Sequence, residues 1–252
     1  MKTIVFNSTK GGCGKSTLSI LTINILVKAG YKVLAIDMDT INHSLSYYFS
    51  EARSAETYLE KNIFNVFAGQ DINDNIISLS PRLSLIPSSV KLSDFRTVEY
   101  GRLRRCLKGI SEPPDYIIID TSPTFDNITI NTFTVADILV IPAIPEPFNY
   151  QAVKYLISKI EELELSNLDI NIVLNQYEKP RSENTSTFSN QVVSLFLSDP
   201  TMGGFVSSHH LSRSNHIKKY TSSREFLLNF EKQKSEILSI VNSLLNISIE
   251  EV

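Results

Sequence analysis

Short apolar runs recur along this chain, and each ends in or beside a polar residue. Runs of this kind, bounded by turn residues, are typical of parallel strands that are buried on both faces. The buried strands that they predict span residues 4–6, 32–37, 83–86, 115–120, 136–142 and 170–175, and a last strand starts at Gly203.

Longer segments between these runs carry apolar residues at helical spacing. They predict long helices over residues 15–29, 150–163 and about 222–249, and shorter ones over residues 55–61, 63–68 and 100–110. A strand, a helix and a second strand already occur before Asp37, which predicts a right-handed βαβ unit. We therefore expect residues 1–252 to form a single α/β domain, an open, mostly parallel twisted sheet with helices on both faces.

Composition and net charge limit which partners and which cellular compartment the sequence favours. The chain has 252 residues and a net charge of −3, so any attraction to DNA or to an anionic membrane must be local. Two cysteines, Cys13 and Cys106, argue against a disulfide framework. We see no leader peptide, no apolar stretch of membrane-spanning length and an acidic tail, so we expect a cytoplasmic protein that does not bind a membrane.

Residues 5–17 read V-F-N-S-T-K-G-G-C-G-K-S-T, an apolar run followed by a glycine-rich turn and a helix. This is how a phosphate-binding loop is built, because backbone N–H groups and the positive end of the helix converge on phosphate oxygens. Lys15 would reach the β- and γ-phosphates, and the Ser16 hydroxyl would bind Mg²⁺. The predicted nucleotide-binding residues of the loop are Lys10, Gly11, Gly12, Cys13, Gly14, Lys15, Ser16 and Thr17.

A second lysine, Lys10, stands inside the same loop. Two ammonium groups in one small loop repel each other unless a strongly anionic group lies beside them, and a triphosphate is such a group. The alternative is a glycine-rich turn with solvated lysines. We favour a site for ATP and Mg²⁺.

Three carboxylates close predicted strands. Asp37 and Asp39 follow the second strand, and Asp120 ends the strand over residues 115–120. Ligands of open parallel sheets collect at the carboxyl ends of strands, so these carboxylates are candidates for organising Mg²⁺ and its water. For Asp39 and Thr40, capping of a helix is the alternative.

The loop K-G-G-x-G-K-S resembles the deviant Walker A loop of the ParA/MinD family of dimeric P-loop ATPases, here the short, Soj-like form of ParA without a helix-turn-helix domain. The resemblance implies that Lys10 crosses a dimer interface to the partner's nucleotide. It also implies that Asp39 orients the attacking water, that Asp37 supports the metal with Ser16 and Asp120, and that catalysis uses Lys10, Lys15 and Asp39.

The chain departs from the family pattern in both switch segments. The family has D-x-D-P-Q where this chain has Thr40 and Ile41 after Asp39, and D-x-P-P where this chain has Ser122 in place of the first proline. Asn175 falls where the family recognises adenine, and a turn asparagine is the alternative.

Basic residues gather between residues 201 and 234 in an otherwise acidic chain. The resemblance implies a nonspecific DNA-backbone contact by Arg213 and, at the place of a second arginine, His216, with Lys218 and Lys219 as substitutes. An evenly spread basic surface is the alternative. A second basic segment, residues 100–110, predicts a solvated helix face, or else a surface for DNA or a partner protein.

The resemblance implies an ATPase with slow, partner-stimulated turnover. Its ATP-bound homodimer would bind nonspecific DNA on the nucleoid and release it after hydrolysis, moving a plasmid or chromosome with a ParB-like partner. The alternatives are a MinD-like regulator of the division site, a ParA-like protein that positions a protein cargo, and a metabolic or iron–sulfur P-loop enzyme. Two cysteines, one of them inside the loop, argue against an iron–sulfur cluster held between two subunits.

Overall fold

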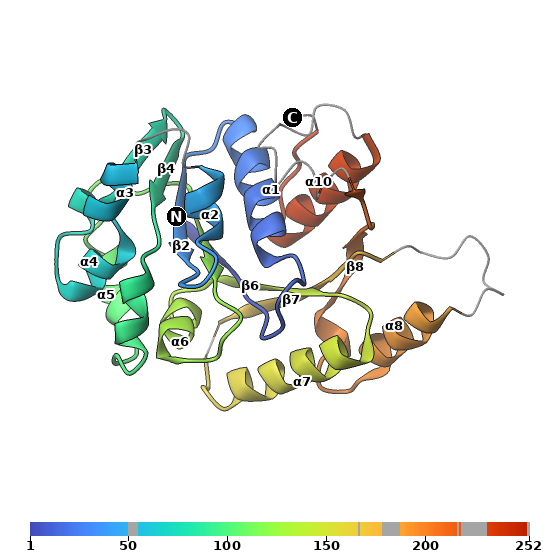
Figure 1. Ribbon diagram of the computed structural model, residues 1–252. Helices are drawn as coiled ribbons and strands as arrows, with labels where there is room; N and C mark the ends of the chain where they lie inside the picture. The colour runs from blue at the N-terminus through green and yellow to red at the C-terminus, as the bar shows by residue number, and fades with distance from the viewer. Residues whose placement is uncertain (50–54, 166, 178–186, 216, 218–230, 251–252) are drawn as a thin grey trace.

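The computed structural model describes residues 1–49, 55–165, 167–177, 187–215, 217 and 231–250 (Figure 1). In this part of the chain, eight strands form one sheet in the order β3-β4-β2-β5-β1-β6-β7-β8. Neighbouring strands are parallel, except that β3 runs antiparallel to β4. The strands are β1 (Lys2–Phe6), β2 (Val33–Met38), β3 (Ile77–Ser80), β4 (Leu83–Ile86), β5 (Tyr116–Thr121), β6 (Ile138–Ala143), β7 (Asp169–Asn175) and β8 (Val206–Leu211).

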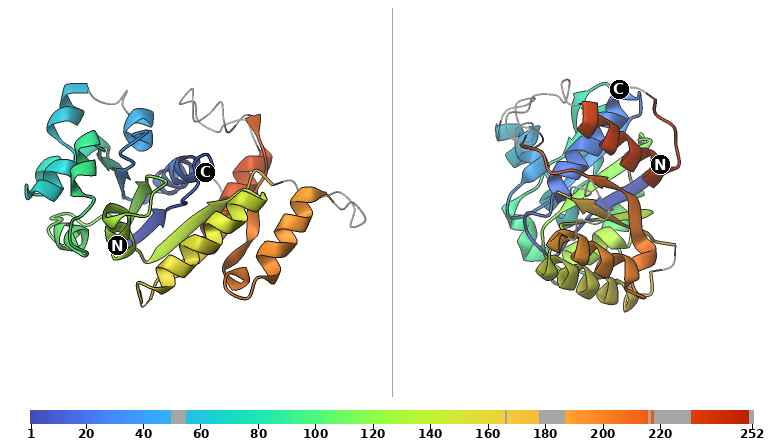
Figure 2. Two further views of the ribbon diagram at one scale, coloured as in Figure 1. Left: turned by 60° about the horizontal axis from the view of Figure 1, so that its bottom comes forward. Right: turned by 90° about the vertical axis from the view of Figure 1, so that its right-hand side faces the viewer.

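Helices cover both faces of the sheet (Figures 1 and 2). One face packs against α1 (Lys15–Lys28), α2 (Ser44–Tyr48) and α10 (Glu231–Leu245). The other packs against α4 (Ile63–Ala68), α5 (Arg102–Leu107), α6 (Asn127–Phe133), α7 (Pro147–Glu161) and α8 (Phe188–Ser198). The remaining short elements are α3 (Ala55–Glu60), η2 (Asn73–Asn75), η3 (Val90–Phe95) and η4 (Gly203–Phe205).

Side chains of each strand alternate between the two cores. On β1, Ile4 and Phe6 pack with α1 and α10, whereas Val5 packs in the opposite core. Because both faces are covered, the central strands are apolar throughout rather than alternating in polarity. The predicted fold class is therefore confirmed.

Several elements differ from the sequence predictions. The last strand starts at Val206 rather than at Gly203, because residues 203–205 form the turn η4, where a Cβ on Gly203 would lie 2.5 Å from the Leu197 carbonyl oxygen. The basic helix predicted over residues 100–110 spans only Arg102–Leu107. The tail helix ends at Leu245, before a left-handed Asn246, and the predicted residues 222–230 lie outside the described part of the chain.

The order of the strands creates a crevice beside β1. This strand lies between β5 and β6, and the helices that follow β1 and β6 cover opposite faces of the sheet. At such a switch point the loops diverge and leave space for a ligand at the carboxyl ends of the strands. Among the described helices, none is long and apolar enough to cross a membrane.

Candidate functional site

The glycine-rich loop leaves β1 at this crevice and enters α1 at Lys15. Gly12 and Gly14 have positive φ angles of 78° and 96°, a left-handed conformation that favours glycine. A Cβ on Gly14 would lie 2.1 Å from Nδ2 of Asn175, so this position also needs glycine for space. The loop therefore has the backbone shape that presents N–H groups to an anion at a helix N-terminus.

The two lysines of the loop lie in different surroundings. Lys15 is only 6% exposed, at the first position of α1. The Lys10 side chain is 33% exposed, and its Nζ lies 2.9 Å from Oε2 of Glu146, the residue that precedes α7. Lys15 is thus built into the floor of the loop, whereas Lys10 is held at its rim by a surface carboxylate.

Buried amide side chains anchor the loop to neighbouring strands and to α7. Asn7 donates from Nδ2 to Oγ1 of Thr121 on β5, at 2.7 Å. Asn149 on α7 and Asn175 on β7 donate to Sγ and to the carbonyl oxygen of Cys13, at 2.9 and 2.7 Å. Cys13 is fully buried, and both cysteines are free thiols. These contacts fix the loop to the sheet before any ligand binds.

Asp120 is a fully buried carboxylate on β5, and neither of its oxygens has a hydrogen-bond partner among the described residues. Burial first, and then the neighbouring Asp37 carboxylate, raise the pKa of Asp120 to about 8. The hydroxyl of Ser16 and the ammonium of Lys15 lower this pKa, although neither forms a well-aligned hydrogen bond to the carboxylate. A buried carboxylate left without partners fits the water shell of a Mg²⁺ ion held at the Ser16 hydroxyl. The described residues contain no group of three His, Cys, Asp or Glu that could hold a metal ion alone.

Asp37 is equally buried, but its oxygens are already used. Oδ2 accepts from the backbone N–H and the hydroxyl of Ser46, at 2.8 and 2.6 Å, and Oδ1 accepts from the N–H of Asp39. Burial raises the pKa of Asp37 to about 6, against the opposing effect of Ser46. Asp37 therefore fixes the start of α2 and the turn that carries Asp39.

Asp39 accepts hydrogen bonds on both oxygens. Oδ1 accepts from the N–H groups of Ile41 and Asn42 and from the Ser122 hydroxyl, at 2.9, 3.1 and 3.1 Å. Oδ2 accepts from Asn42 Nδ2 at 3.0 Å and from the Ser44 hydroxyl at 3.5 Å. The carboxylate thus caps its own turn rather than helix α2, whose N-cap is His43.

A cavity of about 440 Å³ opens beside the loop, lined by Gly12, Gly14, Thr17, Asn175 and Arg213 among others. Its size is that of a small-ligand site. Asn175 stands in its wall, but its Oδ1 accepts from the N–H of Gln176, so it is also the turn asparagine considered above.

Of the predicted DNA-binding residues, the structure describes Arg213, which is exposed at this cavity. His216, Lys218 and Lys219 lie outside the described residues. Within the basic helix α5, Arg104 and Arg105 bind the Thr134 carbonyl oxygen and Glu99, as expected of a solvated face with local pairs.

Several contacts of the site were not predicted from the sequence. Glu146 follows the end of β6 and could have been found by the rule that located Asp37 and Asp120, namely a carboxylate just beyond a buried strand. Asn149 and the Ser122 contact carry no comparable signal, because their partners are 136 and 83 residues away.

Comparison with known proteins agrees with this geometry. A family model described as an AAA domain matches residues 1–174. An uncharacterized protein of Methanocaldococcus jannaschii is 30% identical over 81% of this chain and 83% of its own length. The virulence plasmid ParA family protein pGP5-D of Chlamydia psittaci is 28% identical over 92% of this chain and 94% of its own. A putative plasmid partition protein of Borrelia burgdorferi, solved with AMPPNP bound, superimposes with a TM-score of 0.80 at 27% identity, over 96% of this chain and 98% of that one.

Proposed function

Because the chain belongs to the AAA-domain family and is a P-loop ATPase of the ParA/MinD type, we propose that it is a DNA-partition ATPase. Its ATP-bound homodimer binds nonspecific DNA on the nucleoid and releases it after hydrolysis. A ParB-like protein bound to the cargo stimulates turnover, and the cycle moves a plasmid or chromosome. The Chlamydia and Borrelia relatives, named for a virulence plasmid and for plasmid partition, support this assignment.

One observation carries the proposal, namely the second lysine of the phosphate loop. Lys10 is partly exposed at the rim of the loop and, among the described residues, its ammonium pairs with Glu146 alone, a surface ion pair that contributes little to stability. A cation held so weakly is free to turn to another anion. In an ATP-bound dimer that anion is the partner's triphosphate, which makes the nucleotide part of the interface.

The other residues of the site have separate roles in binding and hydrolysing ATP. Lys15 binds the β- and γ-phosphates from the first turn of α1, and Asp39 orients the water that attacks the γ-phosphate in line. Ser16 and Asp120 would hold Mg²⁺, with Asp37 as a supporting carboxylate, and the bound ion would supply positive charge to the phosphates. Asn175 contacts the adenine from the wall of the cavity.

DNA binding requires a local basic surface, because the chain as a whole is acidic. Arg213 provides one exposed cation next to the cavity, so a contact made there is coupled to the occupancy of the nucleotide site. His216, Lys218 and Lys219 follow it in the sequence. Contacts from such residues to phosphates are independent of sequence and weaken with salt.

The test is sedimentation of the protein with random-sequence DNA, with ATP or ADP, over a salt series. We expect binding that requires ATP, falls with salt, and is lost in Lys10→Ala. Arg213→Ala should weaken binding, whereas Arg82→Ala, which removes an exposed cation at the start of β4, should not.

ATP-dependent dimers that ignore DNA at every salt concentration would contradict the proposal. Binding to liposomes of anionic lipid would then indicate the MinD-like alternative. Binding to neither surface would favour the positioning of a protein cargo.

A further inference from the structure

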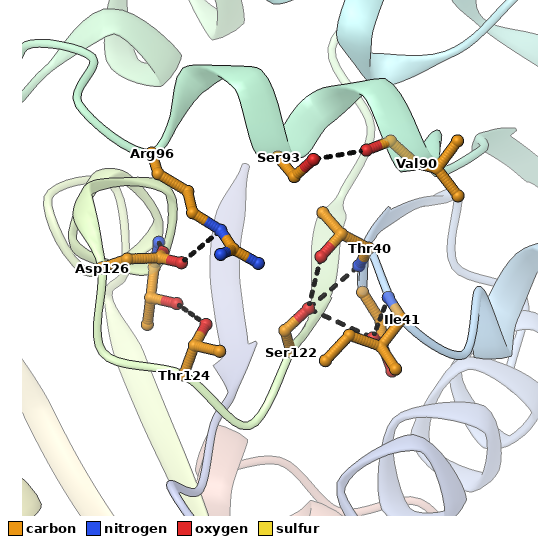
Figure 3. Close-up of polar contacts among 10 residues, drawn as sticks. Thr40, Ile41, Val90, Ser93, Arg96, Ser122, Thr124 and Asp126 are labelled. Atoms are coloured by element: carbon orange, nitrogen blue, oxygen red, sulfur yellow. Dashed lines mark hydrogen bonds and ion pairs between the residues drawn. The ribbon is translucent and has the colours of Figure 1, made fainter.

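The hydroxyl of Ser122 joins the two segments that flank the candidate catalytic carboxylate (Figure 3). It lies 2.9 Å from the backbone nitrogen of Thr40, 3.1 Å from Oδ1 of Asp39 and 3.3 Å from Oγ1 of Thr40. Ser122 is 5% exposed, so these groups are largely shielded from water. The segment that follows β2 is thereby tied to the segment that follows β5.

The direction of each hydrogen bond follows from the chemistry of the groups. An ionised carboxylate only accepts, and a backbone N–H only donates. The Ser122 hydroxyl therefore gives its single proton to Asp39 and accepts the N–H of Thr40, while its second lone pair is available to the Thr40 hydroxyl. All the bonding capacity of this hydroxyl is used within the two segments.

We call the hydrogen-bonded pair Thr40 and Ser122 the clamp. Both residues stand where the ParA/MinD family pattern has proline. Proline has neither a backbone N–H nor a side-chain donor, so a chain with proline at positions 40 and 122 cannot form the bonds from Thr40 to Ser122 or from Ser122 to Asp39. In this chain the two departures contact each other across 82 residues of sequence. They therefore form one structural feature.

Ser122 differs from the other partners of the Asp39 carboxylate. Ile41, Asn42 and Ser44 follow Asp39 within the next five residues, in the turn and at the start of α2, so they belong to the same segment. Among the described residues, Ser122 alone reaches this carboxylate from another segment, the one that follows β5. The bond to Ser122 thus fixes Oδ1 relative to the central sheet. Oδ2 accepts from Asn42 Nδ2 at 3.0 Å and, more weakly, from the Ser44 hydroxyl at 3.5 Å, so it keeps acceptor capacity for a water molecule.

We propose that Ser122 is a positioning residue for ATP hydrolysis, which holds the Asp39 carboxylate and the first switch segment in place before nucleotide binds. The proposal rests on the proposed ATPase function, and it concerns kcat rather than the affinity for ATP. Small displacements of a group that orients a reactant cost up to about 100-fold in rate.

The test compares variants of the full chain in ATP hydrolysis without DNA or partner protein. We expect Ser122→Ala to lower kcat roughly tenfold, while the affinity for a fluorescent ATP analogue changes less than about twofold. Ser122→Thr, which keeps the hydroxyl, should recover most of the rate. Thr40→Ala keeps the backbone donor and should cost less than Ser122→Ala.

The matched control is Thr124→Ala, which removes a hydroxyl from the same segment, where it contacts Thr129 rather than Asp39. Its kcat should equal that of the wild type. A kcat unchanged in Ser122→Ala overturns the proposal, and so does an equal fall in Thr124→Ala.

Amide hydrogen exchange provides a readout that needs no turnover. Loss of one net hydrogen bond should speed exchange in a peptide covering residues 39–43 about fivefold in nucleotide-free Ser122→Ala. Exchange that stays at the wild-type rate overturns the clamp even if no variant hydrolyses ATP. Failure of the wild type to bind DNA would contradict the proposed partition function alone and leave the clamp in place.

Discussion

Asp37 and Asp120 are direct register partners on the neighbouring parallel strands β2 and β5, and both carboxylates are fully buried. Ser46 and Asp39 satisfy Asp37, whereas Asp120 has no hydrogen-bond partner among the described residues. Two buried carboxylates this close cannot both ionise cheaply without a cation. The stability of the folded protein should therefore depend on pH and on bound Mg²⁺.

The first prediction concerns the stability of the nucleotide-free protein against pH. The pKa of Asp37 is raised to about 6 and that of Asp120 to about 8, so the folded state holds protons that the unfolded chain loses near pH 4. The stabilisation of the folded state by these two protonated carboxyls is complete below about pH 4. It is lost as pH rises through the folded pKa values of about 6 and about 8. We expect the melting temperature to fall by roughly 5 °C between pH 6 and pH 8.5, for a loss of about 2 kcal/mol.

Asp120→Asn is the control, because it removes the ionisation with little change of shape. Its melting temperature should change little over the same range and, at pH 8.5, should exceed that of the wild type. Mg²⁺ with ATP should reduce the slope in the wild type. Equal slopes in the two proteins would show that Asp120 is not the titrating group.

The second prediction concerns Glu146 as a competitor of the triphosphate for Lys10. Glu146→Gln removes the carboxylate that lies 2.9 Å from the ammonium. An exposed pair contributes at most about 1 kcal/mol, so stability should change little. The affinity for an ATP analogue should rise about two- to fivefold at low salt, because one negative charge leaves the loop.

Glu162→Gln is the matched control for charge. It removes a carboxylate at the far end of α7, where Glu162 pairs with Lys159. Measured by titration of a fluorescent ATP analogue, its affinity should match the wild type. If the two variants bind the analogue equally well, Glu146 does not compete with the nucleotide.

The third prediction concerns the space that Gly14 leaves for Asn175. Gly14→Ala places a Cβ 2.1 Å from Nδ2 of Asn175 and forces alanine to a φ of 96°. The left-handed backbone alone costs about 1–2 kcal/mol. We expect the free energy of unfolding to fall by about that amount or more, and nucleotide affinity to fall with it. Chemical denaturation and ATP-analogue titration measure the two effects.

A double-mutant cycle separates the two causes. Asn175→Ala in the Gly14→Ala background removes the steric clash but not the backbone strain, so the combined loss should be smaller than the sum of the single losses. Gly204→Ala, where a Cβ meets nothing within 4 Å and φ is not positive, should be neutral. Strict additivity of Gly14→Ala and Asn175→Ala would rule out the clash.

The sequence predicts the parts of this fold that local pattern determines. The apolar runs of β1, β2, β5, β6 and β7 and the glycine loop before α1 are local signals, and each is found close to where it was expected. The candidate carboxylates Asp37, Asp39 and Asp120 follow from the same runs. Their assignment as ligands or catalysts stays a prediction.

Elements that form because of tertiary contacts were not predicted from the sequence. Helix α6 has the sequence N-I-T-I-N-T-F, rich in β-branched residues and asparagine, and is helical because its polar face is buried and bonded; Asn131, for example, accepts the N–H of Leu103. The strand β3 is a short edge strand with little apolar pattern. Helix α8 was also not predicted, although its buried apolar residues at helical spacing and its Thr187 N-cap made it detectable from the sequence.

The last prediction concerns a latch between α7 and α8 at Asp199. Oδ2 of this residue accepts from the Tyr150 hydroxyl at 2.5 Å and from Lys154 Nζ at 2.7 Å, and Oδ1 accepts from the Thr201 hydroxyl and N–H. The Asp199 side chain is 2% exposed, and Lys154 first, then Thr201 and Tyr150, hold its pKa well below the usual range. Removing the charge leaves these donors without an ionised acceptor.

Asp199→Asn should therefore lower the free energy of unfolding at pH 7 by about 1–3 kcal/mol. Because the folded pKa is depressed, the stabilisation is present above the unfolded value near pH 4 and is lost as pH falls through the folded pKa. Urea denaturation at pH 7 and pH 3 measures this, and the difference between variant and wild type should shrink at the lower pH. Glu162→Gln, which breaks an exposed pair on the same helix, should cost less than about 0.5 kcal/mol at either pH. Only the ionised carboxylate can accept from all four donors at once, so the loss of stability in Asp199→Asn should depend on pH. A loss that is independent of pH would mean that the shape of the side chain, rather than its charge, holds the latch.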